Sequence, residues 1–255
     1  MSDPFRTICY KKNFLREVIA RVDLLTPLPG AETSLPKDLI DVAVKAFPIP
    51  EPGESVHNAV QISPGGVASS QERHKEWRFL GKERTKTLTV GRDVIVVQYT
   101  TYQTYELVRD EFLEILECVA ELFDEVQCQR VGLRFVNEVE LEEGSPLDWS
   151  TYLAPKLLSL FQFPSKADSE ALARVFHNVE WALDDFNLSY RFGMPNPDYP
   201  ARIRQKLFVL DLDAYANYAI DLRQAGRLLD DFHTTIQRYF EKSITKNLRS
   251  LMDAD

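Results

Sequence analysis

The stretch Gln127–Leu141, QCQRVGLRFVNEVEL, alternates apolar and charged side chains along most of its length. One parity carries the apolar members, which are Val131, Leu133, Phe135, Val139 and Leu141. The other parity carries the charged members, which are Arg130, Arg134, Glu138 and Glu140. Because successive side chains of a β-strand point to opposite faces, this pattern predicts a strand with one apolar and one charged face. The sheet that contains it is therefore expected to lie with one face against a core.

Two long helices are predicted to supply that core. In Tyr105–Phe123 and again in Leu222–Phe240, apolar residues recur every three or four positions, which is typical of an amphipathic helix. Such stripes are too apolar to face water, so both helices are expected to pack on a sheet. Shorter helices are predicted at Leu35–Phe47, with Ser34 as its cap, and at Trp149–Phe161.

Further strands are predicted in both halves of the chain. Asn13–Leu25 matches both a strand and a helix face, but its β-branched residues and the prolines that follow favour a strand. The other predicted strands are Glu76–Leu80, Arg84–Val90, Val94–Tyr99, Ala173–Leu183, Leu188–Phe192 and Arg202–Asp213. We therefore expect a single α+β domain over residues 1–255, with antiparallel sheet packed against the two long helices. The order hints at two similar sheet-plus-helix halves, at approximately 1–145 and 146–255.

The segment Pro48–His74 is predicted to be a long loop. It collects prolines, glycines and polar residues, and Val60–Ile62 is its one strand-like run. Long loops inside a compact domain are uncommon and are often mobile or functional.

Composition restricts the classes of function. The formal net charge is −9, which disfavours binding to nucleic acid through clustered Lys and Arg. The three cysteines, Cys9, Cys118 and Cys128, are too few and too scattered for a disulfide framework. We expect neither a secretion signal nor a membrane span, because no basic start precedes an apolar run and no stretch of about 18 apolar residues occurs. A cytoplasmic location is expected.

Three segments carry a resemblance to a known family. They are Asn13–Ile19 (NFLREVI), Arg130–Asn137 (RVGLRFVN) and Phe240–Thr245 (FEKSIT). With these segments the chain resembles a sporadically distributed bacterial family of uncharacterised proteins that has a central R-x-G-[LV]-R-[YF]-x-N strand. Phe14 stands where that family often has proline. The resemblance implies no activity, but a scattered distribution is typical of mobile cassettes such as phage-defence or toxin-linked loci.

Arg130 and Arg134 are candidate binding residues, since they lie on one face of the predicted strand about 13 Å apart. Gly132 between them leaves a strip of backbone open, which would suit an anionic ligand or the carboxylates of a partner. The alternative is that both arginines pair with acids across the sheet, for which the candidates are Glu17, Glu138 and Glu140. Glu138 is also a candidate for the binding face.

Asn137 falls on the apolar face, where an unpaired amide is costly. A β-bulge or a bond to a neighbouring backbone is favoured there over contact with a ligand. Asp211 and Asp213 share one side of a strand end, where paired acids can bind Mg²⁺ or act as acid and base. No third carboxylate at a set spacing supports a metal, and His177 and His233 are expected in the core, so no cofactor is predicted.

The leading functional hypothesis is a non-enzymatic binding or adaptor protein, with a partner protein or a second copy of the chain as its target. No G-x-S-x-G, Walker or G-x-G-x-x-G motif follows a predicted strand. The alternative is an enzyme or sensor for a small phosphorylated ligand such as a nucleotide. In that case Arg130 and Arg134 would grip phosphate and Asp211 and Asp213 would hold a metal.

Overall fold

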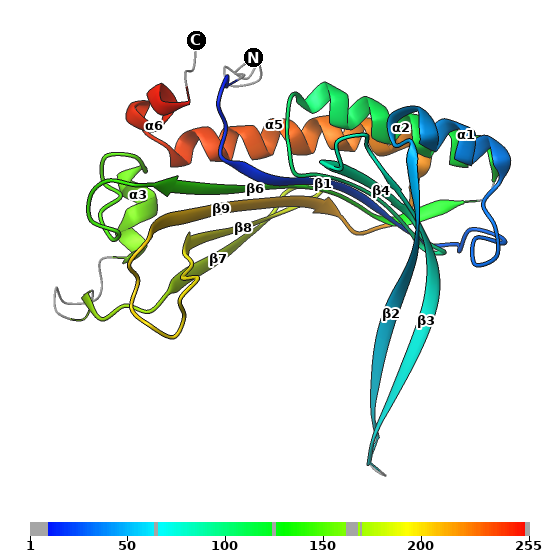
Figure 1. Ribbon diagram of the computed structural model, residues 1–255, viewed down its shortest axis with the longest axis horizontal. Helices are drawn as coiled ribbons and strands as arrows, with labels where there is room; N and C mark the ends of the chain where they lie inside the picture. The colour runs from blue at the N-terminus through cyan, green and yellow to red at the C-terminus, as the bar shows by residue number, and fades with distance from the viewer. Residues whose placement is uncertain (1–9, 64–65, 124–125, 162–167, 169, 253–255) are drawn as a thin grey trace.

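The computed structural model describes residues 10–63, 66–123, 126–161, 168 and 170–252. Within these residues ten strands form one antiparallel sheet, and the long helices lie on one of its faces (Figure 1). The expected α+β class, with an antiparallel sheet against two long helices, is confirmed. None of the described helices is long and apolar enough to cross a membrane.

The strands are β1 Leu15–Leu24, β2 Ile49–Ser63, β3 Gly66–Leu80, β4 Lys86–Val90, β5 Val94–Tyr99, β6 Gln127–Leu141, β7 Val175–Ala182, β8 Asn187–Met194, β9 Lys206–Ala216 and β10 Ile220–Asp221. The helices are α1 Lys37–Ala46, α2 Tyr105–Leu122, α3 Pro155–Leu158, α5 Ala225–Ser243 and α6 Lys246–Leu251, with 3-10 turns at Ser159–Phe161 and Leu222–Gln224. Predicted and observed bounds of β6 coincide.

The strand order is β2-β3-β4-β5-β1-β6-β9-β8-β7, and β10 pairs with the start of β6. Two units follow one another along the chain, and in each the first strand pairs with the last long strand before the long helix: β1 pairs with β5 before α2, and β6 pairs with β9 before α5. The two units therefore divide between α2 and β6, whereas the expected division near residue 145 would place β6 in the first half. The halves meet where β1 pairs with β6. The chain is thus built from two similar sheet-plus-helix units that share one sheet, and buried residues of both belong to one hydrophobic cluster.

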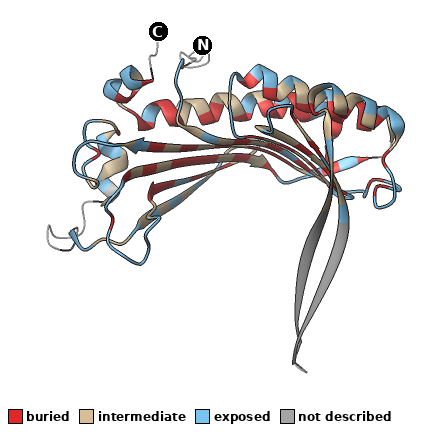
Figure 2. Ribbon diagram, viewed as in Figure 1, coloured by how far each residue is buried: buried red, intermediate tan, exposed pale blue. Residues whose placement is uncertain are grey.

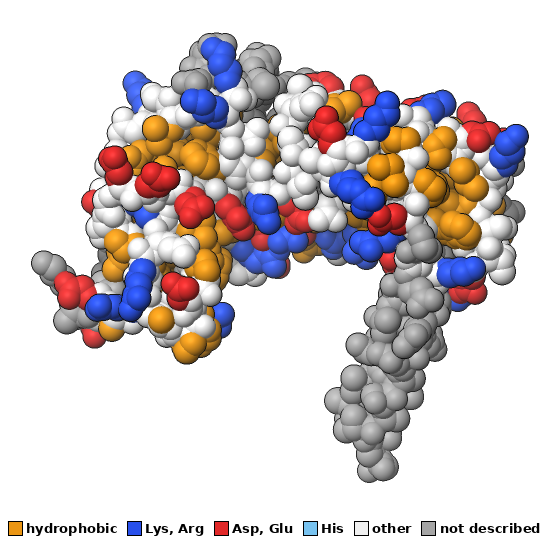
Figure 3. Space-filling model, in the orientation of Figure 1, with side chains coloured by type: hydrophobic (Ala, Val, Ile, Leu, Met, Phe, Trp, Pro, Cys, Tyr) orange, Lys and Arg blue, Asp and Glu red, His pale blue; other side chains and the backbone are white. Residues whose placement is uncertain are grey.

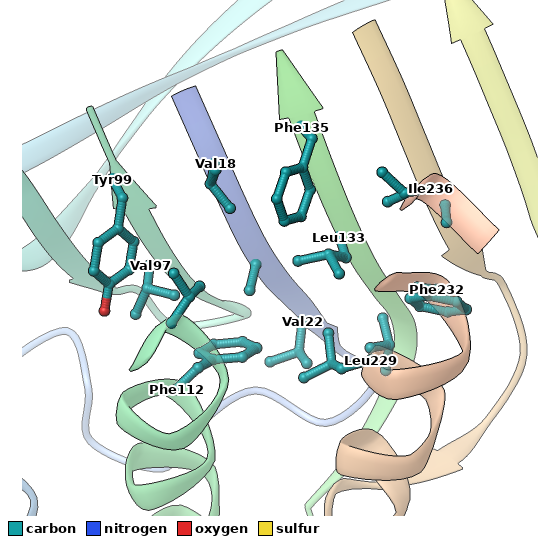
Figure 4. Close-up of a cluster of buried hydrophobic side chains, with 14 of the residues drawn as sticks. Val18, Val22, Val97, Tyr99, Phe112, Leu133, Phe135, Leu229, Phe232 and Ile236 are labelled. Atoms are coloured by element: carbon teal, nitrogen blue, oxygen red, sulfur yellow. The ribbon is translucent and has the colours of Figure 1, made fainter. Parts of the chain in front are cut away.

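Side chains of β1, β6, α2 and α5 form the centre of that core (Figures 2 and 4). The apolar residues on this parity of β6 are buried, apart from the half-buried Leu141 at its end. The α2 stripe faces them with Val108, Phe112, Ile115, Leu116 and Val119, all buried. The predicted packing of a helix on the sheet is therefore observed.

Two carboxylates fasten α2 in place. Asp230 of α5 accepts hydrogen bonds from Arg109 Nε at 2.7 Å and from the Tyr105 hydroxyl at 2.9 Å, which joins the two long helices. Glu111 of α2 accepts a hydrogen bond from Lys86 Nζ of β4 at 2.6 Å. These contacts fix the helix relative to both its neighbour and the sheet.

The prediction of a loop at Pro48–His74 is wrong, because most of this segment belongs to the hairpin β2–β3. The two strands pair continuously from Ile49 opposite Leu80 to Ser63 opposite Gly66. Prolines remove donors from a sheet, but β2 is the terminal strand of the order, and an edge strand tolerates proline where its missing N–H would have faced no neighbour. The prolines, glycines and polar residues of this segment are therefore compatible with a strand at the edge of the sheet, although their composition predicted a loop.

Two helix predictions need correction at their starts. Trp149–Phe161 is helical only from Pro155 onward, and Ala154 is extended with ψ of 137°. The residue before a proline is disfavoured in the α-helical region, so Ala154 cannot readily be part of the helix. The helix therefore begins at Pro155, and proline is well tolerated at the first helical position. Helix α1 begins after Pro36 without any side-chain cap, so Ser34 is not its cap.

Replacing Leu116 with alanine is expected to lower the free energy of unfolding by about 2–5 kcal/mol, because a buried side chain leaves a cavity against the sheet. Leu107 on the same helix is 36% exposed and serves as the matched control. L107A is expected to cost about 0.5 kcal/mol or less. Denaturant unfolding measures both variants, and equal losses would contradict the packing of α2 on the sheet.

Candidate functional site

Helices α1, α2 and α5 cover one face of the sheet (Figure 1). The buried apolar residues of the central strands point toward these helices, so the charged residues that alternate with them lie on the opposite face. Arg134 of β6 is opposite Asp213 of β9, and Val136 is opposite Asp211. Asp211 is in turn opposite Arg191 of β8. Residues that are directly opposite in an antiparallel ladder point to the same face. Strand pairing therefore brings these arginines and aspartates together, and Figure 3 shows Lys and Arg gathered along the side away from the helices.

Seven charged side chains form what we call the arginine–aspartate network: Arg21, Asp23, Arg130, Arg134, Arg191, Asp211 and Asp213. Asp211 is its most enclosed member, at 6% exposed. Arg134 donates to both oxygens of Asp211, at 2.7 and 2.8 Å, and Arg191 Nη2 lies 2.8 Å from Oδ2. Arg134 is therefore held by a bidentate pair, the strongest geometry for a guanidinium and a carboxylate.

Arg130 is held more loosely. Its Nη2 lies 3.4 Å from Asp213 Oδ2, and its Nε lies 3.8 Å from Asp23 Oδ2. The guanidinium carbon lies 4.4 Å from the ring centroid of Tyr215. A Cβ on Gly132 would lie 3.6 Å from the Arg130 Nε and Nη2 atoms. The expected open strip at Gly132 is therefore wrong, because the Arg130 side chain itself covers it.

The two aspartates differ in environment. Burial raises the pKa of the Asp213 carboxyl, and the nearby charges of Arg130 and Arg134 partly offset this effect. Asp211 lies among guanidiniums that neutralise it. Among the described residues, no group of three or more His, Cys, Asp or Glu side chains could hold a metal ion. The carboxylates proposed as metal ligands are instead paired with arginines.

The remaining candidates lie apart from the network. Asn137 is on the helix side, 5% exposed, and its Nδ2 is 3.4 Å from the carbonyl oxygen of Leu210. The register between β1 and β6 shifts at this point, so the favoured bulge and backbone bond are both found. Glu138 lies 3.9 Å from Arg16 Nε in an exposed contact rather than beside Arg134. Exposed ion pairs of this kind contribute little to stability.

Beside Arg130 the charged face is hollowed. A depression of about 760 Å³ lies there, and its lining includes Arg130, Asp23, Leu25 and Tyr218. Leu25 is 51% exposed and Tyr218 is 49% exposed. On the edge strand β7, Phe176 is opposite Gly193 of β8, which has the same parity as Arg191. Phe176 therefore points to the charged face, and it is 50% exposed. Exposed apolar side chains therefore flank the network at both ends.

Sequence patterns alone did not single out Arg21, Asp23 or Arg191. Their positions in the predicted strands assign each to a face, but only the strand order places β8, β9, β6 and β1 side by side. The pairing of Arg134 with Asp211 spans 77 positions of sequence. The sequence thus predicts which face of its own strand each of these residues occupies, but not which residue of another strand it pairs with.

Comparison with known proteins adds no relative: no family model matches the chain, and no curated protein matches it. The resemblance carried by Arg130–Asn137 stays a prediction.

Asp211→Asn is expected to lower the free energy of unfolding by about 1.5–3 kcal/mol, because Arg134 and Arg191 lose an anionic acceptor. Asp213→Asn, two positions along the same strand face, is expected to cost less than about 1 kcal/mol, since it also removes the cost of burying a charge. Denaturant unfolding at pH 7 compares the two. The assignment would fail if the Asp213 variant were the less stable.

Proposed function

We propose that the protein is a non-enzymatic binding or adaptor protein and that the charged face of its sheet binds a partner protein. The observation that carries the proposal is the arginine–aspartate network itself, prearranged on paired strands and flanked by exposed Leu25, Tyr218 and Phe176. Arginine and aromatic residues are enriched in protein interfaces. Side chains that are already ordered lose little entropy on binding, which favours association.

The alternation of charges supports a protein as the partner rather than nucleic acid or a phosphorylated ligand. Nucleic-acid backbones bind clusters of cations that lack nearby anions, whereas each arginine of this network lies beside a carboxylate. The Nε–Nη2 edge of Arg134, which suits bidentate binding of a phosphate, is bonded to Asp211. An anion would have to displace a buried carboxylate to bind this edge of Arg134.

The same geometry supports a particular chemistry for the partner. Among the described carboxylates, those nearest to Arg130 lie 3.4 and 3.8 Å away, so an acidic side chain of a partner can add a shorter bond. The depression next to it offers Leu25 and Tyr218 to an apolar side chain. The partner is a protein that presents an acidic residue next to an apolar one. Following the resemblance, it belongs to the same phage-defence or toxin-linked cassette and meets this chain in the cytoplasm.

Site-specific crosslinking tests the proposal in cells that make the protein at its natural level. The photoreactive residue p-benzoylphenylalanine replaces Tyr218 or Phe176 on the charged face, and Leu107 on α2 is the control position. All three are exposed, at 49%, 50% and 36%. Both face positions are expected to give an adduct with the same protein, identified by mass spectrometry, and position 107 is expected to give none with it. Adducts from position 107 alone, or none at all, would contradict the proposal.

A charge variant tests the role of Arg130 in the same experiment. Arg130→Gln is expected to reduce the adduct from position 218 while changing the free energy of unfolding by less than about 1 kcal/mol. Arg227→Gln is the matched control, because Arg227 is on α5 and its side chain is 87% exposed. An unchanged adduct in Arg130→Gln would remove Arg130 from the interface. An adduct of twice the mass of the chain would identify a second copy as the partner.

A further inference from the structure

A separate pocket of about 510 Å³ lies on the helix side of the sheet. Its walls come from the segment before β1, the first turn of α2, the middle of β6 and the C-terminal half of α5. Its described lining includes the aromatic side chains of Tyr10, Tyr102, Tyr105, Phe135 and Phe240. Its volume falls in the range of sites that enclose small organic ligands.

The pocket exists because helix and strand differ in length. β6 has 15 residues and so spans about 50 Å, whereas α2 has 18 residues and spans about 27 Å. Since α2 begins at Tyr105, it leaves the second half of β6 uncovered on its side. Figure 4 shows Phe135 on β6 and Ile236 on α5, away from the contact between Phe112 and the sheet. Both residues line the pocket.

The aromatic rings are held in fixed pairs. Tyr102 and Phe135 pack edge to face, with centroids 5.6 Å apart, and Tyr10 and Phe240 do so at 6.4 Å. Tyr105 stacks on His233 at 3.9 Å. Rings in such pairs present faces and edges that suit a flat aromatic ligand.

The outer wall is anchored by one buried carboxylate. Glu241 is 1% exposed and accepts hydrogen bonds from the Tyr10 hydroxyl and from Gln237 Nε2, the latter at 3.2 Å. Arg249 Nε of α6 also donates to it, at 2.7 Å. Tyr10 and Gln237 line the pocket, so the wall is tied to α5 and α6 before any ligand arrives.

The polar groups of the pocket favour a ligand that donates hydrogen bonds. Asn137 is 5% exposed and lines the pocket, and within the described part of the chain its Oδ1 accepts no hydrogen bond. This oxygen is not among the buried side-chain atoms that lack a partner, so it is accessible from the pocket and can accept a hydrogen bond from a ligand. Glu106 lines the pocket as well and forms no ion pair with any described residue. Among the described lining residues there is no lysine or arginine.

We propose that this pocket binds a compact aromatic amine. The ring packs against Tyr102, Phe135 and Phe240, and the amino group donates to Asn137 Oδ1 and lies near the Glu106 carboxylate. A cation is favoured by the carboxylate and by the aromatic rings, and an anion is disfavoured because no cation in the described lining would neutralise it. The site is on the opposite side of the sheet from the charged face and does not depend on the proposed function.

Calorimetric titration of the full chain with tryptamine and indole-3-acetate tests the proposal, because the two probes share a ring and differ in charge. Tryptamine is expected to bind saturably and at least about tenfold more tightly than indole-3-acetate, a difference of about 1.4 kcal/mol. Glu106→Gln is expected to remove most of that preference. Glu117→Gln, on the same helix and outside the pocket lining, is expected to behave as the unchanged chain. Gln237→Trp places an indole in the pocket and is expected to abolish binding.

Three results would overturn the proposal. The first is no saturable binding of tryptamine to a chain that unfolds cooperatively. The second is equal affinity for the two probes, which would show that the pocket does not select an amine. The third is tryptamine binding that survives both Glu106→Gln and Gln237→Trp, which would place the bound amine elsewhere. A cooperative unfolding transition in each variant establishes that a loss of binding is not a loss of fold.

Discussion

The pairing of β1 with β6 holds the two sheet-plus-helix units together. It joins the two halves in one register, with Val18 opposite Phe135 and Val22 opposite Val131. Side chains alternate with a period of two, so a slip of one residue would turn the apolar set of either strand toward water. Because of this register, the apolar side chains of the sheet face the helices, and the arginines and aspartates of the central strands lie on the other face.

That division gives the two faces different chemistry. On the charged face, paired strands hold guanidiniums and carboxylates at bonding distance, and Asp211 is enclosed because Arg134 and Arg191 reach it from both neighbouring strands. An antiparallel sheet commonly leaves one face to water, but an ordered set of arginines between exposed apolar side chains is a surface suited to a partner protein. The opposite face, by contrast, is covered by the helices along their whole length.

The pocket near Phe135 lies beyond the start of α2, where this helix no longer covers the sheet. A helix rises about 1.5 Å per residue and a strand about 3.3 Å, so helices of similar residue count cannot cover strands as long as β6. The second half of the chain covers its part of the sheet with α5, while α2 begins only at Tyr105. The space between them is lined by rings and by Asn137, whose Oδ1 accepts no hydrogen bond from the described residues.

Local periodicity was enough to predict the elements whose side chains follow a clear pattern, together with their faces: the alternation in Gln127–Leu141 and the stripe in Tyr105–Phe123 both correspond to the observed structure. The position of Asn137 among apolar residues likewise predicted that its amide would find a hydrogen-bond partner. The edge hairpin that includes most of Pro48–His74, the position of Arg130 over Gly132, and the bond from Arg134 to an aspartate 77 positions away were visible only in the folded chain. The physical reason is that strand order and side-chain pairing arise from contacts between distant segments, which no local pattern encodes.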